Sequence, residues 1–223
     1  MSQPASSTRR DPVLPDRRGR ARSDRRREAL LGALDDLLRE QSLEAINVAD
    51  ISARAGVTRS AFYFYFESKA TAVAALMADV YDDSFVAAML DVSGEAPRAR
   101  MEAGLRAMLS TFDQHEHLYR AMLDARATST TVRDLWNSAR EAFVAPVADS
   151  IAQERRAGRA PQGPPPEVLA SLLLELNDRV LERLARGTEL TRGEHLDALV
   201  AIWTRTIFST DHPTSAPTPG SHR

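Results

Sequence analysis

Apolar residues recur along most of the chain at intervals of three and four, which is the spacing of a helix with one buried face. The pattern begins at residue 24 and predicts a first helix that ends near residue 41. Alternating apolar and polar runs of useful length, the signal of strands, are missing. We therefore predict an all-α protein of about nine helices. Longer ones are expected at about residues 68–90, 97–112, 130–157, 167–186 and 192–209, with a short one at about 115–124.

Two short helices are predicted between the first helix and residue 68. Asn47 can cap the first of them, and Gly56 ends it, because glycine tolerates the backbone conformation that stops a helix. Thr58 can cap the second, which leads into a run of five aromatic residues. A short helix, a tight turn and a second helix with polar and aromatic side chains is an arrangement that places side chains in the DNA major groove.

Prolines mark the expected breaks in the rest of the chain. Pro146 falls inside the predicted helix over 130–157 and should kink it, since proline has no amide hydrogen to donate. The segment 158–166 is rich in glycine and proline and is predicted to be a loop. Residues 211–223 contain three prolines and are predicted to form a flexible tail.

The composition excludes several classes of protein. Hydrophobic residues make up 43% of the chain, which is enough for a real core. There is no cysteine, which excludes disulfides, thiolate metal sites and cysteine nucleophiles. No apolar run is long enough to span a bilayer, and no apolar leader segment is present at the N-terminus. We therefore expect a soluble cytoplasmic protein that does not bind membranes.

Charge is distributed unevenly. The formal net charge is -2, yet residues 1–27 contain nine arginines and three aspartates. A basic end on an acidic body is the asymmetry expected of a DNA-binding end joined to a body with another task. We predict that residues 1–23 form a disordered basic arm. The arm is either a solubilising tail or a DNA contact, in which Arg20 and Arg22 lie close enough to the first helix to reach phosphates or the minor groove.

Residues 55–69 resemble the signature of the TetR family of transcriptional regulators. They read Ala-Gly-Val-Thr-Arg-Ser-Ala-Phe-Tyr-Phe-Tyr-Phe-Glu-Ser-Lys, after an arginine-rich N-terminus and one amphipathic helix. Phe62 stands where the family commonly has leucine, and Phe64 where it has a polar residue or histidine. The resemblance implies a three-helix DNA-binding domain with a helix–turn–helix over 24–69, and a helical ligand-binding and dimerisation domain over 70–210.

The place of each residue in this motif predicts its contact with a double-stranded DNA operator. Residues on the first turn of the second short helix reach base edges, and Arg59 can read guanine. Thr58 can donate to a phosphate, and the backbone at the start of the preceding helix can do the same. The predicted DNA contacts are Arg20, Arg22, Asn47, Val48, Thr58, Arg59, Ser60, Ala61, Tyr63, Phe64, Tyr65 and Lys69.

The aromatic run has two interpretations, as core or as a DNA-facing surface. Consecutive helical residues cannot all point inward. We predict that Phe62 and Phe66 pack inside, and that Tyr63 and Phe64 face the DNA. The family resemblance additionally implies that Tyr63, Tyr65 and Lys69 clamp the DNA backbone.

The last two predicted helices are apolar on more than one side. Such helices need both a core and a partner, which a two-fold dimer would supply by forming a four-helix bundle. The TetR resemblance implies the same homodimer, and a body that encloses a pocket for a small hydrophobic effector.

Within that family, the second half resembles the EthR-like group. The resemblance rests on Ala127-Thr128-Ser129, Leu135-Trp136, Asn177-Asp178-Arg179 and Ile202-Trp203. It implies an elongated apolar channel between helices. Arg140 and Glu182 fall where apolar residues are expected, which indicates a more polar or shorter channel; ordinary core packing is the alternative for every residue of the set. The implied ligand contacts are Met101, Met108, Phe112, Trp136, Arg140, Phe143, Asn177, Asp178 and Trp203.

Other sites and functions receive less support from the sequence. His115 and His117 lie two positions apart and point to different sides of a helix, so we predict exposed residues at a helix start and no metal site. No cofactor motif occurs. A helical hydrolase that uses His115 or His195 is one alternative, although no nucleophile–base pair is visible. An activator with the same scaffold is another, because activation and repression use the same DNA contacts.

Overall fold

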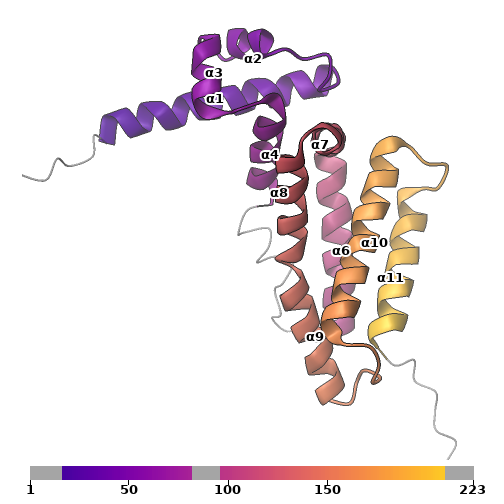
Figure 1. Cartoon of the computed structure of the whole chain (residues 1–223). Helices are drawn as coiled ribbons and strands as arrows, with labels where there is room; N and C mark the ends of the chain where they lie inside the picture. The colour runs from indigo at the N-terminus through magenta and orange to yellow at the C-terminus, as the bar shows by residue number, and fades with distance from the viewer. Residues whose placement is uncertain (1–16, 82–95, 209–223) are drawn as a thin grey trace, which may run out of the picture.

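The computed structural model describes residues 17–81 and 96–208, and within them the chain is helical without a strand. Helices α1–α3 group at one end of the molecule, α4 leads away from them, and the remaining helices form the body, with α10 and α11 along its edge (Figure 1). The bounds are α1 Arg17–Glu40, α2 Val48–Arg54, α3 Arg59–Tyr65, α4 Lys69–Val80, α6 Pro97–Gln114, α7 Glu116–Thr128, α8 Thr130–Glu141, α9 Val144–Arg156, α10 Pro166–Arg186 and α11 Arg192–Ile207.

The head, which we define as α1–α3, is built around one apolar centre. Leu30 and Leu34 of α1, Ile51 of α2 and Phe62 of α3 are completely or almost completely buried. Asn47 caps α2 and forms a capping box with Asp50, in which the Asp50 amide donates to the Asn47 side chain across 3.0 Å. The caps and the buried face together fix where α2 and α3 begin, as the sequence predicts.

Gly56 makes the turn between α2 and α3. Its φ of +66° lies in the left-handed region, where a Cβ is strained even though no atom lies within 4 Å of the position it would take. Gly32, in the exposed middle of α1, has ordinary helical geometry and equally open surroundings.

We expect Gly56→Ala to lower the free energy of unfolding by about 1 kcal/mol, because alanine cannot relax in the left-handed region. Gly32→Ala is the matched control and should raise it by about 0.5–1 kcal/mol, since alanine favours the helix. Urea denaturation of both variants measures the two changes. Changes of the same sign would contradict this assignment of the turn.

The body helices pack around α4, α7 and α10. α4 packs against α1 of the head and against α7 and α8 of the body, so it is the main link between the two parts. α10 packs on α9, α7 and α11, and α11 also packs on α6. None of the helices within residues 17–81 and 96–208 has both the length and the apolar character that a bilayer-spanning helix needs.

Three predicted boundaries are wrong. α1 begins at Arg17, so residues 17–23 are helical and do not belong to the disordered arm predicted over 1–23. The predicted helix over 68–90 ends as α4 at Val80, and residues 82–95 lie outside the described part. The helix predicted over 130–157 is two helices, with a break at residues 142–143.

The break has a physical cause. Pro146 is the third residue of α9, a position whose amide has no partner within the helix, so the missing N–H costs nothing there. The arm over 1–16 and the tail predicted over 211–223 lie outside the described residues.

Candidate DNA-reading surface and ligand pocket

The α3 helix separates the aromatic run into buried and exposed residues. Phe62 is fully buried and Phe66 nearly so, and their ring centroids are 5.6 Å apart. Tyr63 is 50% exposed and Phe64 is 78% exposed. This division is the one that the sequence predicts. An exposed Phe64 has no partner in the core, so this helix presents apolar surface outward.

Polar residues surround these exposed rings at the start of α3. Thr58 caps the helix by accepting a hydrogen bond from the Ala61 amide across 3.3 Å. Arg59 and Ser60 are exposed on the first turn. The Arg59 guanidinium donates to the Tyr63 hydroxyl across 3.4 Å and lies 5.8 Å from the centre of that ring. Arginine and tyrosine therefore form one surface at positions i and i+4.

The polar groups of Tyr65 and Lys69 already have hydrogen-bond partners in α1 and in the turn after it. The Tyr65 hydroxyl lies 3.1 Å from the Ser23 hydroxyl of α1. The Lys69 ammonium donates to the carbonyl of Leu43 across 2.7 Å and also to the carbonyl of Ile46. A weaker hydrogen bond reaches the carbonyl of Glu44 across 3.5 Å, and together these contacts tie the start of α4 to the turn after α1. We therefore leave Lys69 out of the surface that we propose for DNA.

The other predicted DNA contacts are scattered around α3. Asn47 is exposed and Val48 half-buried at the start of α2, while Ala61 is half-buried on α3. Arg22 is exposed on α1. The side chain of Arg20 lies outside the described residues, although its backbone belongs to α1.

A cavity of about 570 Å³ lies in the body between α4, α7, α8 and α10. A volume of this size is typical of small-molecule sites. Six residues of the predicted channel line it, and α4 supplies a wall of small and apolar residues that the sequence analysis did not identify. The predicted residues are Met108, Trp136, Arg140, Phe143, Asn177 and Asp178, and the additional ones include Thr71, Ala74, Ala78, Tyr81, Met122, Leu135, Leu174 and Leu181.

The cavity has one polar corner, centred on Asp178. The Trp136 indole N–H donates to Asp178 Oδ2 across 3.0 Å, and Arg140 donates to the same oxygen across 3.1 Å. Burial raises the pKa of the Asp178 carboxyl above its usual value, although these two hydrogen bonds oppose the rise. Burial, with the charge of Asp178, also raises the pKa of the Tyr81 phenol.

This raised pKa makes the contribution of Asp178 to stability depend on pH. The folded state holds the Asp178 proton more tightly than the unfolded state, so stability falls as pH rises from the unfolded pKa through the raised folded pKa. On going from about pH 7 to about pH 4.5, wild type should therefore gain stability relative to Asp178→Asn, which has no carboxyl to titrate. Denaturation at both pH values measures the difference, and a change that favours the variant in acid would contradict the account.

Three predicted channel residues do not line the cavity. Phe112 is fully buried against Tyr119, with ring centroids 5.0 Å apart, and Met101 packs against the core from α6. Trp203 of α11 lies behind the wall, where its indole N–H donates to the Asn177 side-chain oxygen across 3.1 Å. Trp203 therefore orients Asn177, and regular spacing alone could not separate such a supporting residue from a lining one.

Comparison with known proteins agrees with this arrangement. The family model described as "Bacterial regulatory proteins, tetR family" matches residues 30–76, which contain α2 and α3. The one described as "Transcriptional regulator EthR, C-terminal domain" matches residues 101–209. The HTH-type transcriptional regulator EthR of Mycobacterium tuberculosis (strain ATCC 25618 / H37Rv) is 32% identical over 197 residues, covering 86% of this chain and 91% of that protein. The chain belongs to the TetR family.

One further relative and two solved structures are also similar to the chain. The EthR of Mycolicibacterium smegmatis is 28% identical over 201 residues, covering 87% of this chain and 91% of that protein. A putative TetR-family regulator from Rhodococcus sp. has a similar structure, with a TM-score of 0.64 at 18% identity over 82% of this chain and 99% of that one. NalD, described as the secondary repressor of the MexAB-OprM efflux pump in Pseudomonas aeruginosa, gives 0.64 at 20% identity, over 83% and 98% of the two chains.

The histidines of this TetR protein differ from their prediction. His115 and His117 were expected to be exposed, yet both are half-buried, and His117 contacts Asp35 of α1 across 2.7 Å. His195 is buried, and its Nδ1 lies 2.9 Å from the Thr191 carbonyl. No group of His, Asp or Glu that could hold a metal occurs within residues 17–81 and 96–208. Sequence spacing showed that His115 and His117 diverge, but it could not show that α1 lies against them.

Proposed function

We propose that the protein is a homodimeric, ligand-responsive transcriptional repressor that binds a palindromic operator. The observation that carries the proposal is the outward face of α3, where Arg59, Tyr63 and Phe64 form one exposed surface. Exposed rings beside an arginine are costly to leave in water and fit the edges and methyl groups of bases in a major groove. Thr58, which caps the first turn, would place its hydroxyl beside the phosphates of the bound DNA.

The proposed effector is a small, largely apolar molecule that carries one hydrogen-bonding group. The cavity walls are mainly apolar, and Asp178, Arg140 and Asn177 form their polar corner. Five lining residues lie on α4, which only three residues separate from the end of α3. A ligand that favours one position of α4 would therefore change the position of α3 and lower operator affinity.

The proposed dimer uses α10 and α11. Leu172 of α10 is 58% exposed, and Ile202 of α11 is 43% exposed. Val168 is also exposed, one helical turn from Leu172. This apolar surface on two neighbouring helices supports a self-complementary interface, which a two-fold axis would bury.

We expect Leu172→Glu to convert the dimer into a monomer, because a carboxylate would be buried at the proposed interface. Operator affinity should fall by roughly 100-fold or more, since two linked reading heads bind far more tightly than one. Leu135→Glu is the control for the mass, because Leu135 is a comparably exposed apolar residue of α8 that borders the cavity and lies outside the proposed interface, so the mass should stay unchanged. Light scattering and fluorescence anisotropy measure the two quantities. A Leu172→Glu dimer would contradict the proposed interface.

The function itself is tested by selecting binding sites from random double-stranded DNA with the purified protein. We expect a sequence with two inverted half-sites, and release of that DNA by apolar compounds that quench the fluorescence of Trp136. Selection of no sequence would overturn the proposal. Transcription from a promoter that carries the selected site then separates repression from activation, the second candidate function, which the DNA contacts alone do not distinguish.

A further inference from the structure

One side-chain hydrogen bond joins the head to the start of α7 within the described residues. His117 Nε2 lies 2.7 Å from Asp35 Oδ1 of α1, although 82 positions separate the two residues in the chain. Both side chains are mostly buried, with 14% and 25% of their surface exposed. A short, shielded contact of this kind holds its two helices in one relative position more firmly than an ion pair in full solvent does.

A second residue of α1, Arg39, fixes the orientation of the Asp35 carboxylate. Arg39, one turn further along α1, donates to the second oxygen, Oδ2, across 2.9 and 3.3 Å. Burial alone would raise the pKa of Asp35, but the hydrogen bonds from His117 and Arg39 outweigh it and keep that pKa below its usual value. The carboxylate therefore stays charged, with one oxygen fixed by α1 and the other turned to α7.

The same turn of α7 is tied to α11. Glu116, next to His117, accepts from Arg192 across 2.8 Å, and Arg192 is the first residue of α11. Arg192 also contacts Asp113 at the end of α6. The first turn of α7 thus connects the helix of the head to one of the two helices of the proposed dimer interface.

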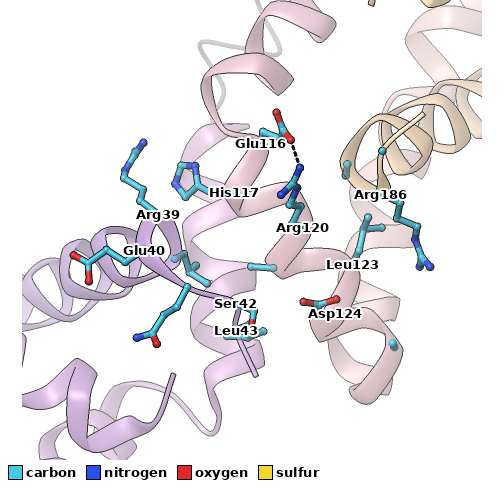
Figure 2. A pocket seen from close by; sticks show the side chains of 16 residues that line it. Arg39, Glu40, Ser42, Leu43, Glu116, His117, Arg120, Leu123, Asp124 and Arg186 are labelled. Carbon is cyan, nitrogen blue, oxygen red and sulfur yellow. Dashed lines mark hydrogen bonds and ion pairs between the residues drawn. The ribbon is translucent and has the colours of Figure 1, made fainter. Parts of the chain in front are cut away.

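An open groove of about 880 Å³ lies beside this contact. Its walls are the end of α1 with the turn after it, α7, and the end of α10. Figure 2 shows His117 of α7 beside Arg39 of α1 at one side of the groove, with Arg186 of α10 across from them. α1 also packs on α4 and α7, and the Asp35–His117 contact is the side-chain hydrogen bond that ties it to α7 beside the groove.

We propose that Asp35 and His117 are positioning residues that set the orientation of the head relative to α11, and with it the spacing between half-sites that the dimer accepts. The inference rests on the proposed function, because it concerns a dimer that reads two half-sites. α1 carries α2 and α3, so a rotation of α1 about the body moves α3 along the DNA. An operator accepts two reading helices at only one separation, about one helical turn or a multiple of it.

The test compares affinities for three DNA duplexes: the selected operator, the same operator with one base pair inserted between its half-sites, and a single half-site. Wild type should prefer the native spacing strongly. In Asp35→Ala and His117→Ala we expect that preference to fall by roughly tenfold, the usual size of a coupling between sites. Affinity for the single half-site should stay unchanged, because the DNA-facing residues of α3 are intact. The control, Glu102→Gln, breaks an ion pair within α6 that joins no two helices.

A reciprocal exchange decides whether the contact itself is responsible. Asp35→His combined with His117→Asp restores the carboxylate–imidazole contact in reversed order and should restore the spacing preference, while either change alone should not. The inference is overturned if wild type has no spacing preference, if the single variants keep it, if they lose half-site affinity to the same extent, or if the exchange restores nothing. Failure of wild type to bind any selected DNA would instead overturn the proposed function.

Discussion

Phe62→Ala should lower the free energy of unfolding by about 3–5 kcal/mol, whereas Phe64→Ala, two positions along the same helix, should change it by less than about 0.5 kcal/mol. Phe62 is fully buried, and its ring packs against Phe66 and the edge of Tyr63 at centroid distances of 5.6 and 5.5 Å. Removing it leaves a cavity in the small core of the head. Phe64 is 78% exposed, so little apolar burial is lost with its ring.

The two variants should differ in the property that they change: Phe62→Ala lowers stability, whereas Phe64→Ala weakens DNA binding without lowering stability. Urea denaturation followed by circular dichroism measures the first, and anisotropy with the selected operator measures the second. Phe64→Ala should remain as stable as wild type and still bind the operator more weakly, since its ring is part of the proposed reading surface. An equal loss of stability in both variants would show that Phe64 is a packing residue and that the α3 surface is assigned wrongly.

Arg59→Ala and Tyr63→Ala should each weaken operator binding with little change in stability. A base-reading contact contributes about 1–3 kcal/mol, and a dimer loses it twice, so the affinity should fall by at least about 30-fold. Tyr63 has a second effect, because its hydroxyl and ring orient the Arg59 guanidinium. The effects of the two substitutions should therefore be less than additive in the double variant.

Arg106→Ala is the matched control for these variants, since it removes an exposed arginine of α6 that pairs only locally, with Glu102. Arg106→Ala removes one positive charge, as Arg59→Ala does, but it should leave operator affinity unchanged. If Arg59→Ala binds the operator as tightly as this control does, then Arg59 does not read bases. Additive losses in the double variant would show that Tyr63 does not orient Arg59.

The sequence predicts the head better than the body, for physical reasons. Capping residues and the left-handed glycine act locally, so Asn47, Gly56 and Thr58 mark the ends of α2 and α3 without knowledge of the rest of the fold. The division of the aromatic run also follows from local geometry, because a helix of one exposed and one buried side must separate Phe62 from Phe64.

The cavity depends on packing between distant helices, which the sequence does not reveal. The resemblance to the EthR-like group implied Phe112 and Trp203 as channel residues as readily as Met108, although only Met108 of these three lines the cavity. The wall formed by α4 was missed because small residues such as Ala74 and Ala78 carry no distinctive chemistry. Their signal is their size: alanines on successive turns of one helix leave room for a ligand beside it.

The contact between Asp35 and His117 illustrates the same limit. The sequence predicts an exposed position for His117 at a helix start, and nothing in the sequence distinguishes Asp35 from the other polar residues of its amphipathic helix. Only the packing of α1 against α7 brings them within 2.7 Å of each other. Contacts between side chains that are far apart in the sequence are therefore the ones that local patterns predict least well.

Protection of guanine N7 from methylation tests the central claim most directly, because N7 is exposed in the major groove, where α3 is proposed to bind. On the selected operator we predict two clusters of protected guanines, with centres separated by about one helical turn or a multiple of it. Both clusters should disappear together in Leu172→Glu at concentrations where wild type protects them. A single cluster, or protection that survives in Arg59→Ala combined with Tyr63→Ala, would contradict a dimer that reads DNA through α3.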